Sequence, residues 1–391
     1  MCKLAYYINE INKNGQIAVD DTILVKDYPA TAGSKMLQNF VPLFSATAVE
    51  KLEAAGYTLS GKTAVGEFGL DLYGETSSND ICAAASLVSD GKVKAALNVD
   101  LSGAPRRAAA IKGVTFVKPT YGTVSRYGII ACACSGEQIG VTAKDADTAA
   151  EILSIIAGYD EKDGTSLKTE KYEYKTDASA NGMKIALVKE LYASADDAVK
   201  AKIDLAVAAY KKSGTIVEEI SLDILSEVQT AWAILMSAET TNNLSRFDGV
   251  KYGYRTEKYK NIDELYVGSR TETFEFLTKA TILYGSDVLS KGKYDDCYDK
   301  ALKIRRVAVE KLTEIFACYD ALLLPAYSKA EFEGYEKEDA FMKAFEESLF
   351  TAPASITGMP AVVAKGVQLV GDYFCDGKLL ALAKVLEKEE A

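Results

Sequence analysis

Residues 100–128, DLSGAPRRAAAIKGVTFVKPTYGTVSRYG, are the stretch that decides the fold. Around this stretch, segments with helical periodicity alternate with segments that have the pattern of strands. Upstream, residues 47–56 predict an amphipathic helix that a glycine stops. Downstream, residues 145–158 predict a helix with an acidic start and a glycine stop. Such alternation is typical of an α/β fold built in layers.

The same reasoning extends along the chain. Residues 22–25 form a short apolar run, which predicts a strand that ends at Lys26. Residues 160–181 are polar and charged without apolar periodicity, so we expect a surface excursion inside one domain that spans residues 1–391. The other predicted elements are strands at residues 182–188, 215–220 and 321–325, and helices at residues 196–214 and 293–319.

The composition indicates a folded protein without a large nucleic-acid surface. Hydrophobic residues make up 48% and charged residues 26% of the chain, as is usual for soluble domains. Lysine and arginine total 45 against 56 acidic residues, so the net charge of −11 disfavours direct contact with DNA or tRNA. The first residues lack the pattern of a secretory signal, and no apolar run reaches the roughly 18 residues of a membrane span. We therefore expect a cytoplasmic protein with no membrane contact.

The chain contains no histidine, and this absence excludes several kinds of site. It excludes Ser-His-Asp and Cys-His catalysis and histidine-ligated metals. The seven cysteines are scattered through a long chain, unlike the disulfide framework of a short secreted domain. We therefore expect no metal and no cofactor. Any hydrolytic chemistry would have to use lysine, serine, cysteine, tyrosine or carboxylates.

Residues 118–128, KPTYGTVSRYG, resemble the amidase signature family, and within it the A subunits of tRNA-dependent amidotransferases. The similarity continues through SKML and NFVP at residues 34–42, through residues 237–255 and through GVQLVG at residues 366–371. This resemblance implies a mixed central sheet sandwiched between helix layers. It also implies that the chain is shorter at its N-terminus than the family, because only 25 residues precede Lys26.

The family uses a serine nucleophile, a second serine in a cis peptide and a lysine, and the resemblance locates each position here. The nucleophile position is Ala104, because DLSGAPRR stands where the family reads roughly DTGGSIRQ. One placement of the glycine-rich loop puts Asn79 at the second serine, and another deletes that loop, leaving Ser78 as a turn residue. Lys26 takes the lysine position, either as a desolvated general base or as an inherited lysine that is now solvated or paired.

The family's substrate pocket has also lost polar side chains in this chain. Three of the positions that the resemblance assigns to the pocket, Asp100, Gly103 and Arg106, are kept in this chain. The positions that resemble a glutamine clamp are Trp232 or Ala233, Ala280 or Thr281, and Ser348. Since an arginine and a carboxylate are what bind the two ends of an amino acid, neutral replacements argue against glutamine binding. Glu347, next to Ser348, is the nearest carboxylate that could substitute.

These observations predict a non-catalytic homologue in protein biosynthesis that keeps the scaffold and the surfaces that bind partners. Its expected partners are other amidotransferase subunits and, only through them, tRNA. One alternative is an active amidase that uses Lys26 with a relocated nucleophile, namely Ser102, Ser78 or Cys82. A second alternative is a small-molecule binder that uses the vestigial pocket.

Overall fold

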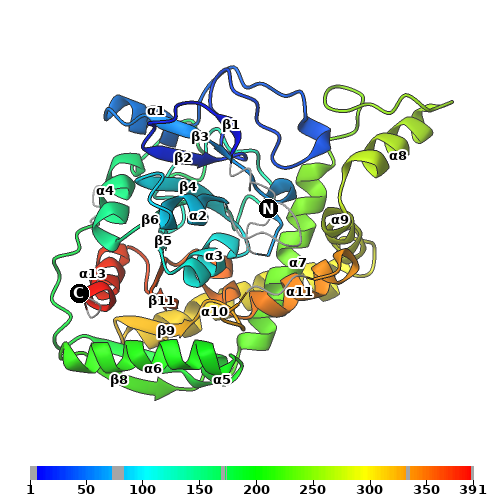
Figure 1. The fold of residues 1–391 in the computed structure, drawn as a ribbon. Coiled ribbons are helices and arrows are strands. Elements are labelled where there is room, and N and C mark those ends of the chain that lie inside the picture. Colours follow the sequence, from blue (N-terminus) through cyan, green and yellow to red (C-terminus); the bar gives the residue numbers. More distant parts are fainter. Residues whose placement is uncertain (1–6, 73–82, 169–171, 173, 332–334, 389–391) are drawn as a thin grey trace.

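The computed structural model describes residues 7–72, 83–168, 172, 174–331 and 335–388 (Figure 1). These residues form one mixed sheet of eleven strands in the order β1-β3-β2-β4-β6-β5-β10-β11-β9-β7-β8. The pairs β2–β3, β2–β4, β7–β8 and β7–β9 are parallel, and the other neighbouring pairs are antiparallel. The strands are β1 Tyr7–Glu10, β2 Ile17–Asp20, β3 Leu59–Thr63, β4 Ala95–Asp100, β5 Thr115–Lys118, β6 Gln138–Ala143, β7 Lys184–Val188, β8 Ile216–Ile220, β9 Ala321–Pro325, β10 Ala361–Ala364 and β11 Val367–Val370.

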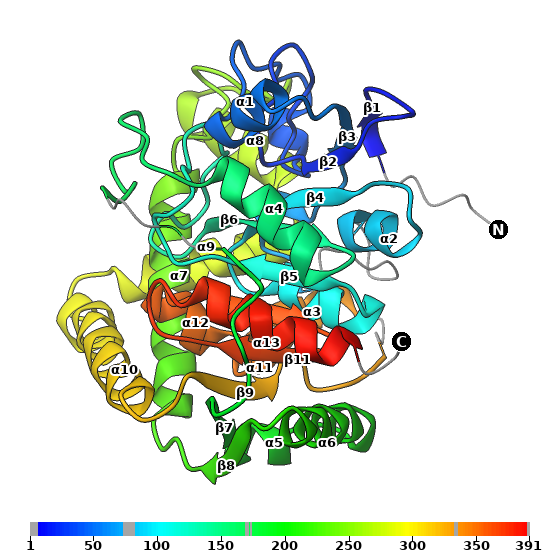
Figure 2. The same ribbon diagram turned by 90° about the vertical axis from the view of Figure 1, so that its left-hand side faces the viewer.

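Helices cover both faces of this sheet, because successive side chains of a strand point to opposite faces. In β2, Ile17 and Val19 pack with α1, α4 and α13, whereas Ala18 packs with α2 and α3. Figure 2 shows α4 and α13 side by side in front of the sheet. The helices are α1 Thr47–Ala54, α2 Ala83–Ser89, α3 Ala104–Lys112, α4 Ala146–Ile156, α5 Lys189–Ala193, α6 Asp197–Lys212, α7 Leu225–Leu244, α8 Ile262–Thr273, α9 Phe276–Val288, α10 Lys300–Phe316, α11 Ala340–Ser348, α12 Ala352–Thr357 and α13 Asp376–Lys388. The predicted mixed sheet between helix layers is confirmed.

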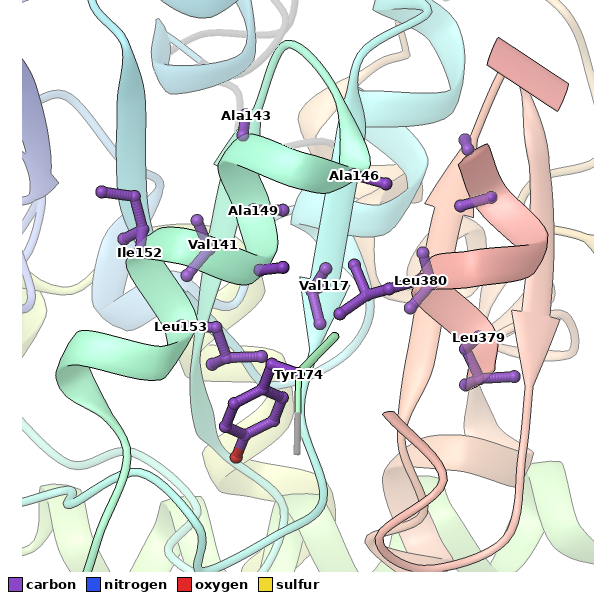
Figure 3. Close-up of a cluster of buried hydrophobic side chains, with 14 of the residues drawn as sticks. Val117, Val141, Ala143, Ala146, Ala149, Ile152, Leu153, Tyr174, Leu379 and Leu380 are labelled. Atoms are coloured by element: carbon purple, nitrogen blue, oxygen red, sulfur yellow. The ribbon is translucent and has the colours of Figure 1, made fainter. Parts of the chain in front are cut away.

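The largest core cluster lies between the sheet and the α4–α13 layer. Val117 of β5 and Val141 of β6 lie against Leu153 of α4 and Leu380 of α13, and all four side chains are fully buried (Figure 3). Tyr174 reaches the same cluster from the polar stretch 160–181 and is 5% exposed. That stretch is therefore tied to the core at this point.

The sequence patterns locate most of these elements, with one error that affects the site. The helices predicted at residues 47–56 and 145–158 are α1 and α4, and Asp145 caps α4 by accepting a hydrogen bond from the Thr148 N–H. The apolar run at residues 22–25 is not a strand, whereas residues 17–20 form β2. The strand that precedes Lys26 therefore ends six residues before it. Of the helices in the described part of the chain, none is long and apolar enough to cross a membrane.

Candidate functional site

The loop between β4 and α3 carries the position that the resemblance assigns to the nucleophile. Asp100 ends β4, and Ala104 is the first residue of α3. Gly103 has a φ of +92°, and a Cβ atom there would lie 2.4 Å from the Thr351 side chain, so the loop requires glycine. The Gly103 N–H donates to Asp100 Oδ1 at 2.9 Å. The loop therefore keeps a defined shape, but the side chain at its helix end is a methyl group that is 3% exposed.

Arg106 fixes this loop against α12 and β11 and is fully buried. Its guanidinium makes five hydrogen bonds, two of them to Asp100 with Nε donating to Oδ2 at 2.7 Å. The others reach Thr351 O, Gln368 Oε1 and Ser355 Oγ. Because every donor is used inside the protein, Arg106 has none left for a substrate carboxylate. Its contacts are those of a scaffold residue.

A small cavity lies beside this loop and brings Ser102, a candidate nucleophile, together with three clamp candidates, Trp232, Ala233 and Ser348. Ser102, Trp232 and Ser348 line it, together with Ala233, Leu277 and Phe345 among others. Its volume is about 30 Å³, which is room for about two water molecules. The Trp232 indole is 2% exposed and packs over Gly136, where a Cβ atom would lie 2.0 Å from Trp232 Cη2. The indole therefore packs closely against the backbone just before β6.

The polar groups at and beside the predicted glutamine clamp form hydrogen bonds with other groups of the protein. Ser348 Oγ donates to Phe345 O, and Thr281 Oγ1 donates to Leu277 O one helical turn earlier. Thr281 is not among the residues that line the cavity. Glu347 accepts hydrogen bonds from the N–H and the hydroxyl of Ser328. The structure thus places Ser348 in the cavity but keeps Thr281 out of it and points the Glu347 carboxylate at Ser328.

Lys26 lies on an exposed loop, and its side chain is not buried. Its backbone N–H donates to Ser45 Oγ at 3.0 Å, and the next residue, Asp27, has a φ of +66°. No hydrogen bond or ion pair of the described residues joins its side chain to Ser102 or to any other serine. The solvated interpretation of Lys26 fits this position.

A buried polar cluster at the end of β2 is the part of the site that the sequence patterns did not reveal. Asp20 accepts hydrogen bonds from Asn98 Nδ2 and the Val99 N–H, both at 2.9 Å, and from Thr63 Oγ1 at 3.1 Å. Burial raises the pKa of Asp20 to about 7. The cluster forms because β2 and β4 pair in parallel, with Val19 beside Leu97. This pairing brings the ends of both strands to one place.

Lys62 of β3 supplies the positive charge of this cluster. Its Nζ donates to Ile23 O and lies 3.8 Å from Asp21 Oδ1. Burial lowers the pKa of Lys62 to about 8, and the neighbouring Asp21 and Asp20 oppose that shift. Lys62 is therefore the described lysine beside these carboxylates. It donates hydrogen bonds to backbone carbonyls and forms an ion pair with Asp21.

Lys118, which ends β5, is a second buried lysine near the loop. It is 1% exposed, and burial, together with the Arg106 charge, lowers its pKa to about 7. The carboxylate of Asp376 accepts hydrogen bonds from the N–H and the hydroxyl of Thr120. The KPTYG run is therefore embedded between β5 and α13 and belongs to the scaffold.

Three candidate residues, Ser78, Asn79 and Cys82, lie outside the described residues. Within the described part of the chain, no cluster of three or more cysteine, aspartate or glutamate side chains could hold a metal ion.

Comparisons with known proteins agree with this architecture. The family model described as "Amidase" matches residues 16–80 and 83–380. The A subunit of glutamyl-tRNA(Gln) amidotransferase from Thiobacillus denitrificans is 37% identical over 94% of this chain and 81% of its own length. Its counterpart from Halothermothrix orenii is 35% identical over 95% of this chain and 84% of its own length. The crystal structure of the counterpart from Thermotoga maritima has a TM-score of 0.79 and 28% identity, covering 98% of this chain and 87% of that one. The chain therefore belongs to the amidase signature family, with close similarity to the A subunit of glutamyl-tRNA(Gln) amidotransferase.

Proposed function

We propose that this chain is a non-catalytic member of the amidase family, a cytoplasmic homologue of the amidotransferase A subunit that acts as a scaffold. The observation that carries the proposal is Ala104 at the nucleophile position, on the N-terminus of α3. A methyl group cannot attack a carbonyl carbon, and losing one member of such a catalytic unit removes most of its rate enhancement.

The hydroxyl of Ser102, two residues before Ala104, has no base among the described residues that line its cavity. A serine nucleophile needs a proton acceptor within about 2.6–3.2 Å. The described residues that line the Ser102 cavity include no lysine, carboxylate or thiol. The Ser102 carbonyl oxygen, in turn, accepts hydrogen bonds from Arg107 Nη1 and Thr351 Oγ1, which holds the backbone in place. These facts argue against relocation of the nucleophile to Ser102.

The lysine of the family also lacks a counterpart in the place where chemistry would need it. The resemblance implies a lysine that follows an apolar strand, and the residue that ends β2 is Asp20. Three donors from Thr63, Asn98 and Val99 hold that carboxylate. We infer that Asp20, not the exposed Lys26, occupies the family lysine's place, and that this part of the site is now a polar core.

The size of the old pocket supports the same conclusion. Ligand pockets usually enclose about 300–1,000 Å³, whereas the Ser102 cavity has about 30 Å³. The volume also disfavours a small-molecule binder that uses this vestigial pocket. Accordingly, the parts of the protein that remain useful are its rigid frame and its outer surfaces.

The partners follow from the relatives, which are subunits by name. We infer that this chain docks with another subunit of an amidotransferase, and that it meets tRNA only through that partner. The net charge of −11 supports an indirect role, because it gives the protein no general attraction for a phosphate backbone.

Labelling with a fluorophosphonate probe, followed by peptide mass spectrometry, tests the absence of an activated nucleophile. We expect no covalent adduct on any serine of the wild-type chain, and in particular none on Ser102 or Ser78. Iodoacetamide labelling at limiting reagent addresses Cys82, for which we expect the rate of an ordinary thiol. An adduct at one of these residues that disappears in Lys26→Ala, but persists in the control Lys251→Ala, would overturn the proposal.

A further inference from the structure

A much larger cavity lies away from the Ser102 cavity and has no role in the function proposed above. It has a volume of about 630 Å³ and opens between residues 36–40, 129–131 and 246–254. Its walls are mostly apolar, with Met36, Leu37, Phe40, Ile130, Phe247 and Tyr252 among them. The loop between β2 and α1 reaches the segment between α7 and α8 here (Figure 1). We call this the loop cavity.

Defined contacts hold the walls of the loop cavity together. The Tyr254 N–H donates to Met36 O at 2.9 Å, and Lys35 Nζ lies 4.3 Å from the centre of the Tyr254 ring. The Phe247 ring stacks on Phe68 at 5.3 Å, which anchors the floor in the core. The cavity is therefore formed before any ligand arrives, which lowers the entropic cost of binding.

An exposed apolar strip continues from the cavity along the surface. We define the strip as residues 40–44, FVPLF, in which Leu43 is 85% exposed and Phe40, Val41 and Phe44 are between 38% and 46% exposed. Pro42 is buried, and the Phe44 ring stacks on Tyr127 at 5.1 Å, so the backbone of the strip is supported from below. Contiguous exposed apolar side chains of this kind mark interaction surfaces in soluble proteins.

Cationic side chains surround the cavity and the strip. Lys26, Lys35, Arg246 and Lys251 are exposed, and none of them forms an ion pair with a carboxylate among the described residues. Arg246 is the charged residue of the cavity lining, and its Nε and Nη2 donate to Asn243 while Nη1 has no described acceptor.

Three carboxylates lie near these cations and offset part of their charge. Asp248 accepts backbone N–H groups of Val250 and Lys251, and Glu272 accepts the Tyr254 and Thr256 hydroxyls. Asp27, beside Lys26, and Glu272 are exposed, and Glu272 interacts with the Lys35 charge. The four cations exceed the three carboxylates by one positive charge, on a chain whose net charge is −11.

We propose that the loop cavity and the strip form the docking site for an acidic amphipathic segment of a partner protein. A large apolar side chain of that segment fills the cavity, its apolar face covers Leu43 and Phe44, and its carboxylates face Lys26, Arg246 and Lys251. A small ligand in the cavity would leave the strip exposed to water. An anionic membrane would repel the rest of this acidic chain and would leave the cavity unfilled. The proposal rests on the scaffold role proposed above, for which it names the surface.

Two fluorescent 18-residue helical peptides with identical leucine and phenylalanine faces test the site by anisotropy. One peptide carries glutamate on its polar face and the other carries lysine. We expect the full chain to bind the glutamate peptide at least tenfold more tightly, and Leu43→Ser to lose at least tenfold of that affinity. Arg246→Glu combined with Lys251→Glu reverses the preference. Leu205→Ser, which changes a leucine that is 72% exposed on α6, is the matched control and leaves binding unchanged.

Equal binding of the two peptides, or no loss in Leu43→Ser while circular dichroism shows a native fold, would overturn the proposal. Binding to phosphatidylglycerol vesicles that exceeds binding to the glutamate peptide would overturn it in favour of a membrane surface. The probe-labelling experiment decides catalysis independently of these peptides. A labelled serine together with the expected peptide preference would refute the non-catalytic role and leave the docking site standing.

Discussion

Replacing Trp232 with alanine tests whether the indole fills the old pocket. Removing a buried tryptophan usually costs about 3–5 kcal/mol of unfolding free energy. The indole N–H of Trp232 has no acceptor among the described residues, so its removal returns about 1–3 kcal/mol of desolvation cost. The net loss should therefore be about 2 kcal/mol. For a chain of 391 residues, with an unfolding entropy of about 2.1 cal/mol/K per residue, this loss lowers Tm by about 2–3 °C.

Urea unfolding followed by far-UV circular dichroism measures this loss without relying on tryptophan fluorescence. The cavity left in Trp232→Ala is lined mostly by apolar side chains, with three serines among them, and apolar cavities of about 150 Å³ are known to bind benzene-sized molecules. Indole at ten times its dissociation constant should therefore return about 1.4 kcal/mol to the variant and nothing to the wild type. Trp232→Phe is the control, since it keeps a ring and removes the orphaned N–H, and its stability should stay within about 1 kcal/mol of the wild type.

Trp232 is the single tryptophan of the chain, so its fluorescence reports on this cavity alone. We expect emission at the short wavelength of a buried indole and little quenching by acrylamide. The reasoning is refuted if the wild-type emission is that of a solvated indole, or if indole does not stabilise Trp232→Ala.

The remaining predictions concern the packing and the buried charges around the same loop. Gly136→Ala should lower the free energy of unfolding in urea by about 1–3 kcal/mol, because its Cβ would overlap the indole of Trp232. Gly164 has open space around it, so the control Gly164→Ala should lower it by less than about 0.5 kcal/mol. Arg106→Gln should cost about 3–5 kcal/mol, because it leaves the Asp100 carboxylate buried without its cation, and a loss below about 1 kcal/mol would show that the pair is not desolvated. Burial lowers the pKa of Lys118 from 10.5 to about 7, so the folded protein binds fewer protons than the unfolded chain between these values. The contribution of Lys118 to stability therefore rises with pH across that window, and Lys118→Met should flatten the dependence of unfolding free energy on pH; an unchanged slope would contradict the assignment.

The sequence was sufficient for elements whose ends carry local signals. The helix at Ala146–Ile156 follows from its aspartate cap and its apolar spacing, and β9 follows from an uninterrupted apolar run. These signals act within a few residues and need no knowledge of the rest of the chain. The mixed sheet followed from the family resemblance and is confirmed.

The site was less predictable, because its geometry depends on pairing between distant segments. Residues 17–19 and 22–25 are both short, mainly apolar runs, and only pairing with β3 and β4 places the first in a strand and leaves the second irregular. That pairing ends β2 at Asp20 and moves Lys26 onto an exposed loop. No periodicity in one segment reveals which of two runs finds a partner.

In the polar stretch 160–181, the sequence likewise did not predict contacts with distant segments. Its composition indicates a solvated excursion, yet Asp160 accepts the hydroxyls of Thr47 and Ser125, and Asp163 accepts the Arg126 N–H. Both aspartates are 9% exposed, because they satisfy groups on other elements. Polarity therefore predicted the absence of regular structure there, while the burial depended on tertiary contacts.

The release of ammonia from glutamine tests the central claim most directly. The assay compares the wild-type chain, Ala104→Ser and the A subunit of a tRNA-dependent amidotransferase in which all three catalytic residues are present. Our account predicts that the wild type and Ala104→Ser both stay at the rate of buffer alone, because restoring the hydroxyl restores neither the base nor the pocket. Ammonia release by the wild-type chain that saturates with glutamine and disappears in Lys26→Ala would contradict it.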